Sequence, residues 1–250
     1  MTDPAFERVV DAAARRYAPA GRFARHFARG KLGGDPVFAE ILRRGLIPDG
    51  ARVLDLGCGQ GVLLALLLAA RDQHRAGTWP AGWAPPPARF VLHGIEFLAR
   101  DVARGNLALA GEGRVEHGDL RHAPIPSGDV VVLMDVLHYL EPDAQERLLA
   151  RVADALDPRG LFLTRVGDPS ARFTAGFSWV LDQCVAFARG QGLHRFHRRT
   201  IGEWTAVLER HGFAVTAEPM NGGKLFANVL LTGRRRPYAG RRAGSDGSGG

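Results

Sequence analysis

Cysteine and long apolar runs are scarce in this chain, and their scarcity excludes several classes of protein. The 250 residues include two cysteines, Cys58 and Cys184, without the Cys-x-x-Cys spacing of a thiolate metal site. We therefore expect no disulfide framework, no metal and a reducing, cytoplasmic location. The longest nearly apolar run, residues 61–70, has about half of the roughly 20 residues that a membrane span needs. The N-terminus lacks the apolar stretch of a signal peptide.

Lysine is almost absent as well, because Lys31 and Lys224 are the only two among 33 basic residues. The formal net charge is +7, and the five arginines and one aspartate of residues 233–250 account for +4 of it. The rest of the chain therefore has a small basic excess, which makes nucleic acid an unlikely partner. Residues 233–250 are rich in Gly, Ser and Arg without apolar periodicity, and we expect this basic tail to be disordered.

The remaining sequence alternates between strand and helix patterns. Residues 5–30 have helical apolar spacing, the glycines of residues 30–34 predict a break, and a second helix is expected over 36–45. Thr200 and Glu203 have the spacing of a capping box. The expected strands are 51–56, 90–95, 114–117, 129–134, 160–166, 213–218 and 225–232, and the expected helices are 61–72, 98–110, 143–156 and 200–211. Such alternation predicts a parallel sheet with helices on both faces, ending in an antiparallel hairpin.

A glycine-rich turn follows the first expected strand, where residues 53–61 read Val-Leu-Asp-Leu-Gly-Cys-Gly-Gln-Gly. Glycine lets a ligand approach the backbone closely. The dinucleotide fingerprint G-x-G-x-x-G lacks its third glycine here, and the phosphate-binding P-loop lacks its lysine. What remains is Asp55-x-Gly57-x-Gly59-x-Gly61. Because a carboxylate repels a pyrophosphate and attracts an ammonium group, the turn predicts a cationic ligand of amino-acid type.

This turn, and the chain over roughly residues 45–232, resemble the class I S-adenosylmethionine-dependent methyltransferases that act on small molecules. The resemblance implies a Rossmann-like, seven-stranded, mostly parallel sheet with an antiparallel last strand and helices on both faces. It implies a helical lid at residues 1–45 and a methyltransferase domain at 46–232, in which segment 169–200 covers the substrate. The cofactor implied is S-adenosyl-L-methionine.

The resemblance also assigns cofactor contacts. The glycines face the methionine part, Asp55 helps to position its amino end, Glu96 accepts from both ribose hydroxyls, and Asp119 and Leu120 bind the adenine. Asp55, Glu96 and Asp119 end successive strands, the edge where open α/β sheets bind ligands. Asp55 and Glu96 are 41 residues apart, about twice the usual ~20, and a long loop at 71–89 explains the excess. The full predicted set is Asp55, Gly57, Cys58, Gly59, Gly61, Glu96, Phe97, Asp119, Leu120 and Asp135.

Candidates for catalysis are three histidines, since an oxygen acceptor must lose its proton during methyl transfer. His138 follows the fourth strand, and packing or a cofactor contact is the alternative role. His194 and His197 lie in segment 169–200, where each is a base, a substrate anchor or part of a solvated basic face. Asp135 is also a candidate to orient the substrate.

Two further groups of residues have open roles. Tyr17 and residues 23–31 precede the glycine turn, where relatives close a lid over the cofactor. Lys31 or Arg29 there would meet the methionine carboxylate or simply end a solvated helix. Six aromatic residues either line an apolar substrate pocket or fill the core: Trp79, Trp83, Phe173, Phe177, Trp179 and Phe187.

The sequence therefore predicts a methyltransferase that modifies oxygen or carbon of a small, apolar or aromatic metabolite, in secondary-metabolite biosynthesis for example. Two alternatives stay open: an RNA methyltransferase, and a non-catalytic S-adenosylmethionine-binding partner protein. We expect a monomer or homodimer.

Overall fold

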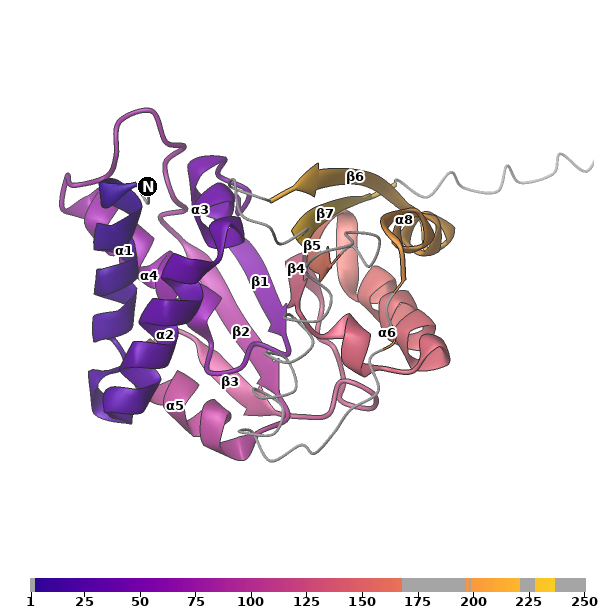
Figure 1. Cartoon of the computed structure of the whole chain (residues 1–250), viewed down its shortest axis with the longest axis horizontal. Helices are drawn as coiled ribbons and strands as arrows, with labels where there is room; N and C mark the ends of the chain where they lie inside the picture. The colour runs from indigo at the N-terminus through magenta and orange to yellow at the C-terminus, as the bar shows by residue number, and fades with distance from the viewer. Residues whose placement is uncertain (1–2, 168–196, 198, 221–227, 237–250) are drawn as a thin grey trace, which may run out of the picture.

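The chain folds around one seven-stranded sheet with helices on both faces (Figure 1). The computed structural model describes residues 3–167, 197, 199–220 and 228–236. The sheet order is β3-β2-β1-β4-β5-β7-β6, and β7 runs antiparallel to both of its neighbours, β5 and β6. This confirms the predicted fold class. The strands are β1 Ala51–Leu56, β2 Phe90–Glu96, β3 Arg114–His117, β4 Gly128–Met134, β5 Leu156–Gly167, β6 Phe213–Pro219 and β7 Asn228–Arg235.

Strand β1 is the centre of the site, because it pairs in parallel with β2 on one side and with β4 on the other. Successive side chains of a strand point to opposite faces of a sheet. Val53 accordingly packs into the core on one face and Leu54 into the core on the other. Burial on both faces explains why the strand is a nearly continuous apolar run. Its end, like those of β2 and β4, opens at the carboxyl edge of the sheet.

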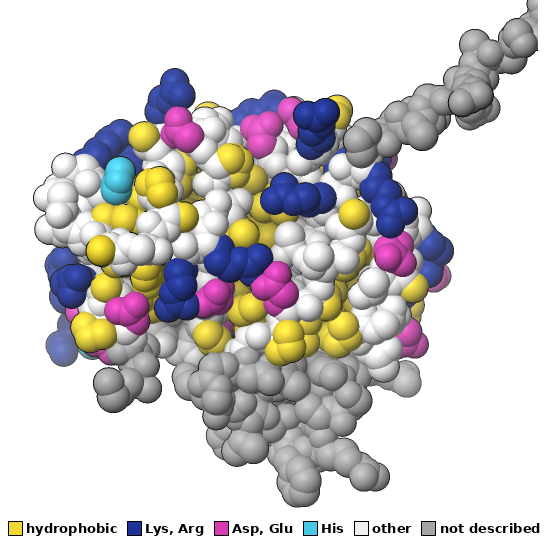
Figure 2. Space-filling model, turned by 90° about the horizontal axis from the view of Figure 1, so that it is seen from above, with side chains coloured by type: hydrophobic (Ala, Val, Ile, Leu, Met, Phe, Trp, Pro, Cys, Tyr) yellow, Lys and Arg dark blue, Asp and Glu magenta, His cyan; other side chains and the backbone are white. Residues whose placement is uncertain are grey.

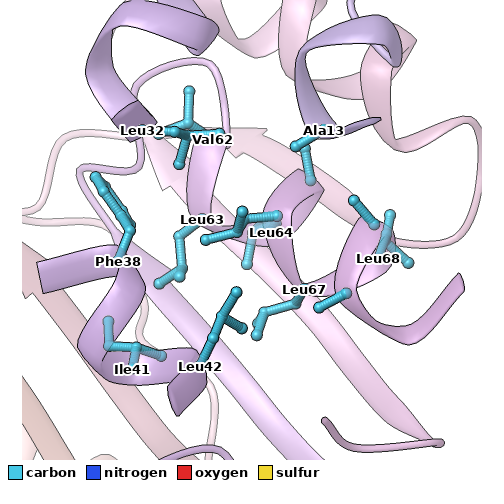
Figure 3. Packing of buried hydrophobic residues seen from close by; sticks show 14 of the residues in the cluster. Ala13, Leu32, Phe38, Ile41, Leu42, Val62, Leu63, Leu64, Leu67 and Leu68 are labelled. Carbon is cyan, nitrogen blue, oxygen red and sulfur yellow. The ribbon is translucent and has the colours of Figure 1, made fainter. Parts of the chain in front are cut away.

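Two groups of helices cover the two faces. One face packs against α1 Pro4–Arg15, α2 Arg22–Gly34, α3 Pro36–Arg43, α4 Val62–Arg75 and α5 Ala99–Leu109, and the other against α6 Pro142–Ala155 and α8 Ile201–Arg210. Figure 3 shows Leu63 and Leu67 of α4 pointing toward Phe38 and Leu42 of α3. The buried apolar side chains of α1 to α4 thus fasten the N-terminal helices to the sheet.

The predicted break between residue 30 and the second helix lies at Asp35, which separates α2 from α3, but the sequence pattern missed an earlier break. The chain also breaks at the 3-10 turn Ala18–Ala20 and at Gly21, whose φ is +94°. Helix α2 then runs without interruption to Gly34, beyond the predicted helix end at residue 30. A Cβ at Gly33 would stand 3.9 Å from Val10 of α1, an ordinary contact distance, so α1 packs against this part of α2. Such packing offsets the roughly 1 kcal/mol that glycine costs inside a helix.

The expected start of the basic tail is also wrong, because β7 continues to Arg235. Gly233 pairs with Phe162 of β5 and Val215 of β6, so this strand is held from both sides. A strand between two others has its backbone hydrogen-bonded on both sides, whatever its side chains are. The apolar pattern of the sequence therefore placed the end of β7 too early. Residues 237–250 lie outside the described residues.

The long loop after α4 packs Trp79 and Trp83 into the core. Trp83 lies 6.3 Å from Phe6 of α1 between ring centroids, and the Trp79 indole donates to the Ala84 carbonyl at 3.0 Å. The loop enters β2 at its first residue, so it lies at the amino edge of the sheet, opposite the strand ends that carry the glycine turn. Core packing is therefore the role of these two tryptophans, and the pocket alternative is wrong for them. The predicted pocket residues Phe173, Phe177, Trp179 and Phe187 lie outside the described residues. None of the described helices has the length and apolar character to cross a membrane.

Candidate cofactor site

The glycine turn has a backbone that side chains would not tolerate. Gly57, Gly59 and Gly61 have φ of +69°, +57° and +73°, the left-handed region that favours glycine. A Cβ at Gly57 would overlap the side chain of Val136, which follows β4. The turn is therefore a close-fitting cradle at the carboxyl edge, held in shape by hydrogen bonds from the Gly57 and Cys58 amides to the Ile95 carbonyl of β2. The Cys58 thiol fills the space beside Gly94 of β2.

Asp55 is a buried carboxyl at the end of β1. Its side chain is 4% exposed, and among the described residues no hydrogen bond or ion pair reaches it. Burial, together with the nearby charge of Glu96, raises the pKa of Asp55 to about 7. A buried carboxylate without a partner is costly, so this position is complementary to a cationic group of a ligand.

Glu96 ends β2 and fastens the glycine turn. Its Oε2 accepts a hydrogen bond from the Gly59 amide at 2.9 Å, and its Oε1 accepts one from the Leu98 amide at 2.9 Å. Each carboxylate oxygen has a second lone pair, so both can still accept from the two hydroxyls of a ribose. Sequence analysis found the residue but not its bond to Gly59.

The expected adenine end combines Phe97, Asp119 and Leu120. Phe97 is 51% exposed and stacks on His117 with centroids 6.3 Å apart, so one face of its ring is open to a flat ligand. Arg121 binds both carboxylate oxygens of Asp119 and lowers its pKa. An adenine amino group would thus share this carboxylate with Arg121. Leu120 is buried at 8% exposure.

These groups fit S-adenosylmethionine. A buried, partnerless carboxyl suits the ammonium group, a carboxylate with open lone pairs suits a vicinal diol, and an exposed aromatic ring suits an adenine. Because its glycines have no side chains, the turn leaves room for the methionine part of the ligand. The predicted residues Asp55, Glu96 and Asp119 do come together at one edge of the sheet.

The N-terminal helices hold the turn from outside. The Tyr17 hydroxyl donates to the Gln60 carbonyl at 2.7 Å, and the Gln60 side-chain amide donates to the Ala24 carbonyl of α2 at 2.7 Å. Tyr17 and Gln60 are both buried, and burial raises the pKa of Tyr17 well above its usual value. Sequence analysis singled out Tyr17 but missed Gln60, although a glutamine between two glycines of a buried turn was a signal.

Asp135 takes part in a network of ion pairs that spans four elements. Arg165 of β5 binds both of its oxygens and also binds Asp35, the N-cap of α3. Lys31 of α2 binds Asp135 at 2.7 Å and lies 3.6 Å from Asp35. Burial opposes ionisation of Asp135, but Arg165 and Lys31 outweigh it and hold the pKa of this carboxyl well below its usual range. We call these four residues the edge network. Sequence analysis missed Asp35 and Arg165.

Two of the three predicted histidines lie side by side. His138 is in the 3-10 turn Leu137–Tyr139 after β4, and its carbonyl accepts from the His197 amide at 2.9 Å. The His197 ring reaches Glu141, a side chain 74% exposed, at 3.1 Å. His138 thus follows a site strand, whereas the His197 ring, itself 18% exposed, pairs with the exposed Glu141 at the start of α6. His194 lies outside the described residues.

Gln145 of α6 holds this histidine pair together. Its buried side-chain amide lies 3.0 Å from each of three carbonyls, those of Leu137, Leu140 and His197. Its side-chain oxygen accepts from Arg199 at 2.9 Å. Gln145 therefore connects the turn of His138 to His197 and Arg199, near the end of segment 169–200. Sequence analysis did not single it out.

The surface seen in Figure 2 has basic and acidic side chains interspersed with apolar ones. On this face the described residues form no continuous basic area. A broad phosphate-binding surface would gather Lys and Arg on one face.

Comparisons with known proteins agree on one family. Residues 24–218 match a family model described as a methyltransferase domain. The carboxy-S-adenosyl-L-methionine synthase of Chromohalobacter salexigens is 29% identical over 171 residues, which cover 63% of this chain and 57% of that relative. The chain therefore spans less than two thirds of the length of this relative.

Solved structures share the fold. An O-methyltransferase family protein from Burkholderia thailandensis matches with a TM-score of 0.52 and 20% identity, over 75% of this chain and 52% of that protein. Magnesium protoporphyrin IX methyltransferase from Synechocystis PCC 6803, with bound S-adenosylhomocysteine, matches with a TM-score of 0.56 and 16% identity, over 88% and 93%.

Proposed function

The chain belongs to the class I S-adenosylmethionine-dependent methyltransferases, and from this membership we propose that it methylates oxygen or carbon of a small, apolar or aromatic metabolite. Its cofactor is S-adenosylmethionine. The observation that carries the proposal is the carboxyl edge of β1 and β2, where the partnerless Asp55, the left-handed glycines and Glu96 meet. We propose all ten predicted contact residues as the cofactor site, with Asp135 acting through the edge network.

When bound, S-adenosylmethionine supplies a methyl carbon that its sulfonium activates for displacement. The chain's task is then to align the acceptor and, for a hydroxyl, to take up its proton. His138 follows β4 directly and is the base that we favour, with Gln145 as its positioning residue through the Leu137 and Leu140 carbonyls. His197 is the weaker candidate because its ring is already engaged by the Glu141 carboxylate.

We propose that residues 1–45 act as a helical lid, that 46–232 form the catalytic domain and that segment 169–200 covers the substrate. The contacts of Tyr17 and Ala24 with Gln60 support the first of these roles. The position of Gln145 between the His138 turn and His197 supports the third. We propose a cytoplasmic monomer or homodimer. Size-exclusion chromatography with light scattering measures the oligomeric state.

The test uses S-adenosylmethionine with a labelled methyl group. Titration calorimetry with S-adenosylhomocysteine comes first, and failure to bind it would overturn the proposal. The labelled cofactor is then incubated with a lipid-soluble metabolite extract or with total RNA. We expect label in the extract and none in RNA. Label in RNA would favour the RNA methyltransferase, and binding without any transfer would favour the non-catalytic partner protein. His138→Asn is the matched variant, expected to bind the cofactor and lose transfer.

A second candidate function involves a carboxylated cofactor. The relative from Chromohalobacter salexigens is named a carboxy-S-adenosyl-L-methionine synthase, and two cations of this chain, Lys31 and Arg165, lie beside Asp135 at the end of β4. A carboxylate on the transferred group would need such cations nearby. Mass spectrometry of the cofactor that copurifies with the protein distinguishes the two functions. The plain cofactor supports methyl transfer, and the carboxylated form supports this second candidate.

A further inference from the structure

Lys31 lies between the lid and the methionine end of the site. It belongs to the last turn of α2, and its ammonium group is 2.7 Å from Asp135. Asp135 immediately precedes Val136, whose side chain closes against Gly57. Lys31 therefore places a positive charge beside the part of the turn where the family's methionine moiety lies.

The bond from Lys31 to Asp135 is dispensable for the edge network. Arg165 already donates to both oxygens of Asp135 through its Nε and one terminal nitrogen, and its other terminal nitrogen binds Asp35. Asp35 also caps α3 by accepting from the Val37 amide at 3.2 Å. If Lys31 leaves, neither carboxylate becomes a buried charge without a partner, which is the costly outcome.

Exposure separates the two cations of the edge network. The Arg165 side chain is 10% exposed and is fixed between two carboxylates, whereas the Lys31 side chain is 32% exposed. A flexible lysine stem can swing its ammonium group to a new partner without moving the helix. The other cation that sequence analysis considered, Arg29, points away from the site to Asp11 of α1 at 2.7 Å.

The charges of the site require such a cation. Asp55 and Glu96 are both acidic, so they favour the ammonium group of an amino acid and repel its carboxylate. The α-carboxylate of the methionine part therefore needs a positive partner close to the turn. Lys31 is the half-exposed cation of the edge network and meets this need.

Resting on the proposed cofactor, we propose that Lys31 exchanges partners: it binds Asp135 in the free protein and the α-carboxylate of the methionine part in the complex. Arg165 retains Asp135 throughout. Helix α2 stays in place during the exchange, and Lys31 is a residue that distinguishes ligands with an amino-acid end from those without one.

The test compares two ligands by titration calorimetry. S-adenosylhomocysteine has the amino-acid end, and 5′-methylthioadenosine lacks both its amino and its carboxylate groups. For Lys31→Met we expect Kd for S-adenosylhomocysteine to rise about 10- to 100-fold, the effect of one charge-assisted hydrogen bond. The Kd for methylthioadenosine should change less than about threefold. Decarboxylated S-adenosylmethionine, which keeps the amino group, should behave like methylthioadenosine and so isolate the carboxylate.

Arg29→Met is the matched control, because it removes a cation from the same helix, two residues away, and should leave both affinities unchanged. Lys31→Arg should restore most of the preference, and a urea unfolding curve for each variant confirms that it is folded. Equal losses for both ligands in Lys31→Met, or no loss for either, would overturn the exchange while leaving the cofactor intact. If the unsubstituted protein binds no S-adenosylhomocysteine, the proposed function itself fails.

Discussion

The hydroxyl of Tyr17 donates a hydrogen bond of 2.7 Å to the carbonyl of Gln60, which joins the N-terminal helices to the middle of the glycine turn. Both residues are buried, and the Gln60 side chain extends the contact to Ala24 of α2. The shape of the turn thus depends on residues that lie 36 and 43 positions earlier in the chain.

Tyr17→Phe should therefore weaken both the fold and the site. The substitution leaves a buried carbonyl without its donor, which costs about 1–3 kcal/mol of unfolding free energy. Urea denaturation measures this loss, and calorimetry should show weaker binding of S-adenosylhomocysteine. The control is Thr78→Val, which removes an exposed hydroxyl donor to the Gln73 carbonyl and should change neither quantity. Unaltered affinity in Tyr17→Phe would show that the turn keeps its shape without this bond.

The raised pKa of Asp55 makes cofactor binding depend on pH. Burial and the charge of Glu96 disfavour the ionised form and raise the pKa of Asp55 to about 7 in the folded, free protein, well above the ordinary range of an aspartate. If an ammonium group binds the ionised form, affinity for S-adenosylhomocysteine should rise about tenfold per pH unit between pH 5 and 7 and then level off. Calorimetry across this range tests the slope, and a flat profile would contradict the assignment.

The same shift has the opposite effect on the stability of the free protein. Folding holds the Asp55 proton more tightly than the unfolded chain does, so the free protein loses stability as pH rises from about 4 to 7. Asp55→Asn removes this penalty. We expect the variant to be more stable than the parent at pH 8 by urea denaturation, with the difference vanishing near pH 4, and to bind the cofactor more weakly.

Arg165→Met should be among the most damaging single substitutions in the chain. It leaves the carboxylates of Asp35 and Asp135 with Lys31 alone, and breaking a buried ion pair from one side costs about 3–5 kcal/mol. The loss appears as a lower urea midpoint. Arg89→Met removes an ion pair to Asp49 in which the arginine is 81% exposed, and should cost less than about 1 kcal/mol. Similar midpoints for the two variants would show that the edge network contributes little.

Gln145→Leu tests whether one side chain couples the His138 turn to His197. The volume is nearly kept, but three carbonyls and Arg199 lose a partner, so we expect about 1–3 kcal/mol of destabilisation. Hydrogen exchange of the Leu137–Tyr139 turn should rise, while affinity for S-adenosylhomocysteine stays constant because Gln145 does not touch the glycine turn. Gln73→Leu, which loses one exposed hydrogen bond to the Arg8 carbonyl, is the control. Weakened cofactor binding in Gln145→Leu would contradict the expectation that the His138 turn and the glycine turn are independent of each other.

Much of the core was predictable from the chain alone. Strands β1 and β3 begin and end where the sequence pattern placed them, and the Thr200–Glu203 capping box forms as expected. Buried parallel strands are dense apolar runs, and a capping box is local, so both signals survive without tertiary information. Helix α2 and strand β7 both continue beyond the glycines at which the sequence pattern ended them. Packing against α1 and pairing between two strands stabilise backbone that local propensity disfavours.

The sequence by itself determined the chemistry of the turn, because the left-handed conformations of Gly57, Gly59 and Gly61 follow from residue type, and the acidic ends of β1 and β2 follow from their order. Tertiary structure decided which charges meet. Arg165 reaches Asp35 across 130 positions of the chain and Asp135 across 30, and both contacts exist because β5 lies next to β4 beneath the junction of α2 and α3. Ion pairs of this range leave no periodic trace in a sequence, since they depend on strand order and helix placement. For that reason the sequence singled out Asp135 as a ligand contact but did not predict its ion pairs with Arg165 and Lys31.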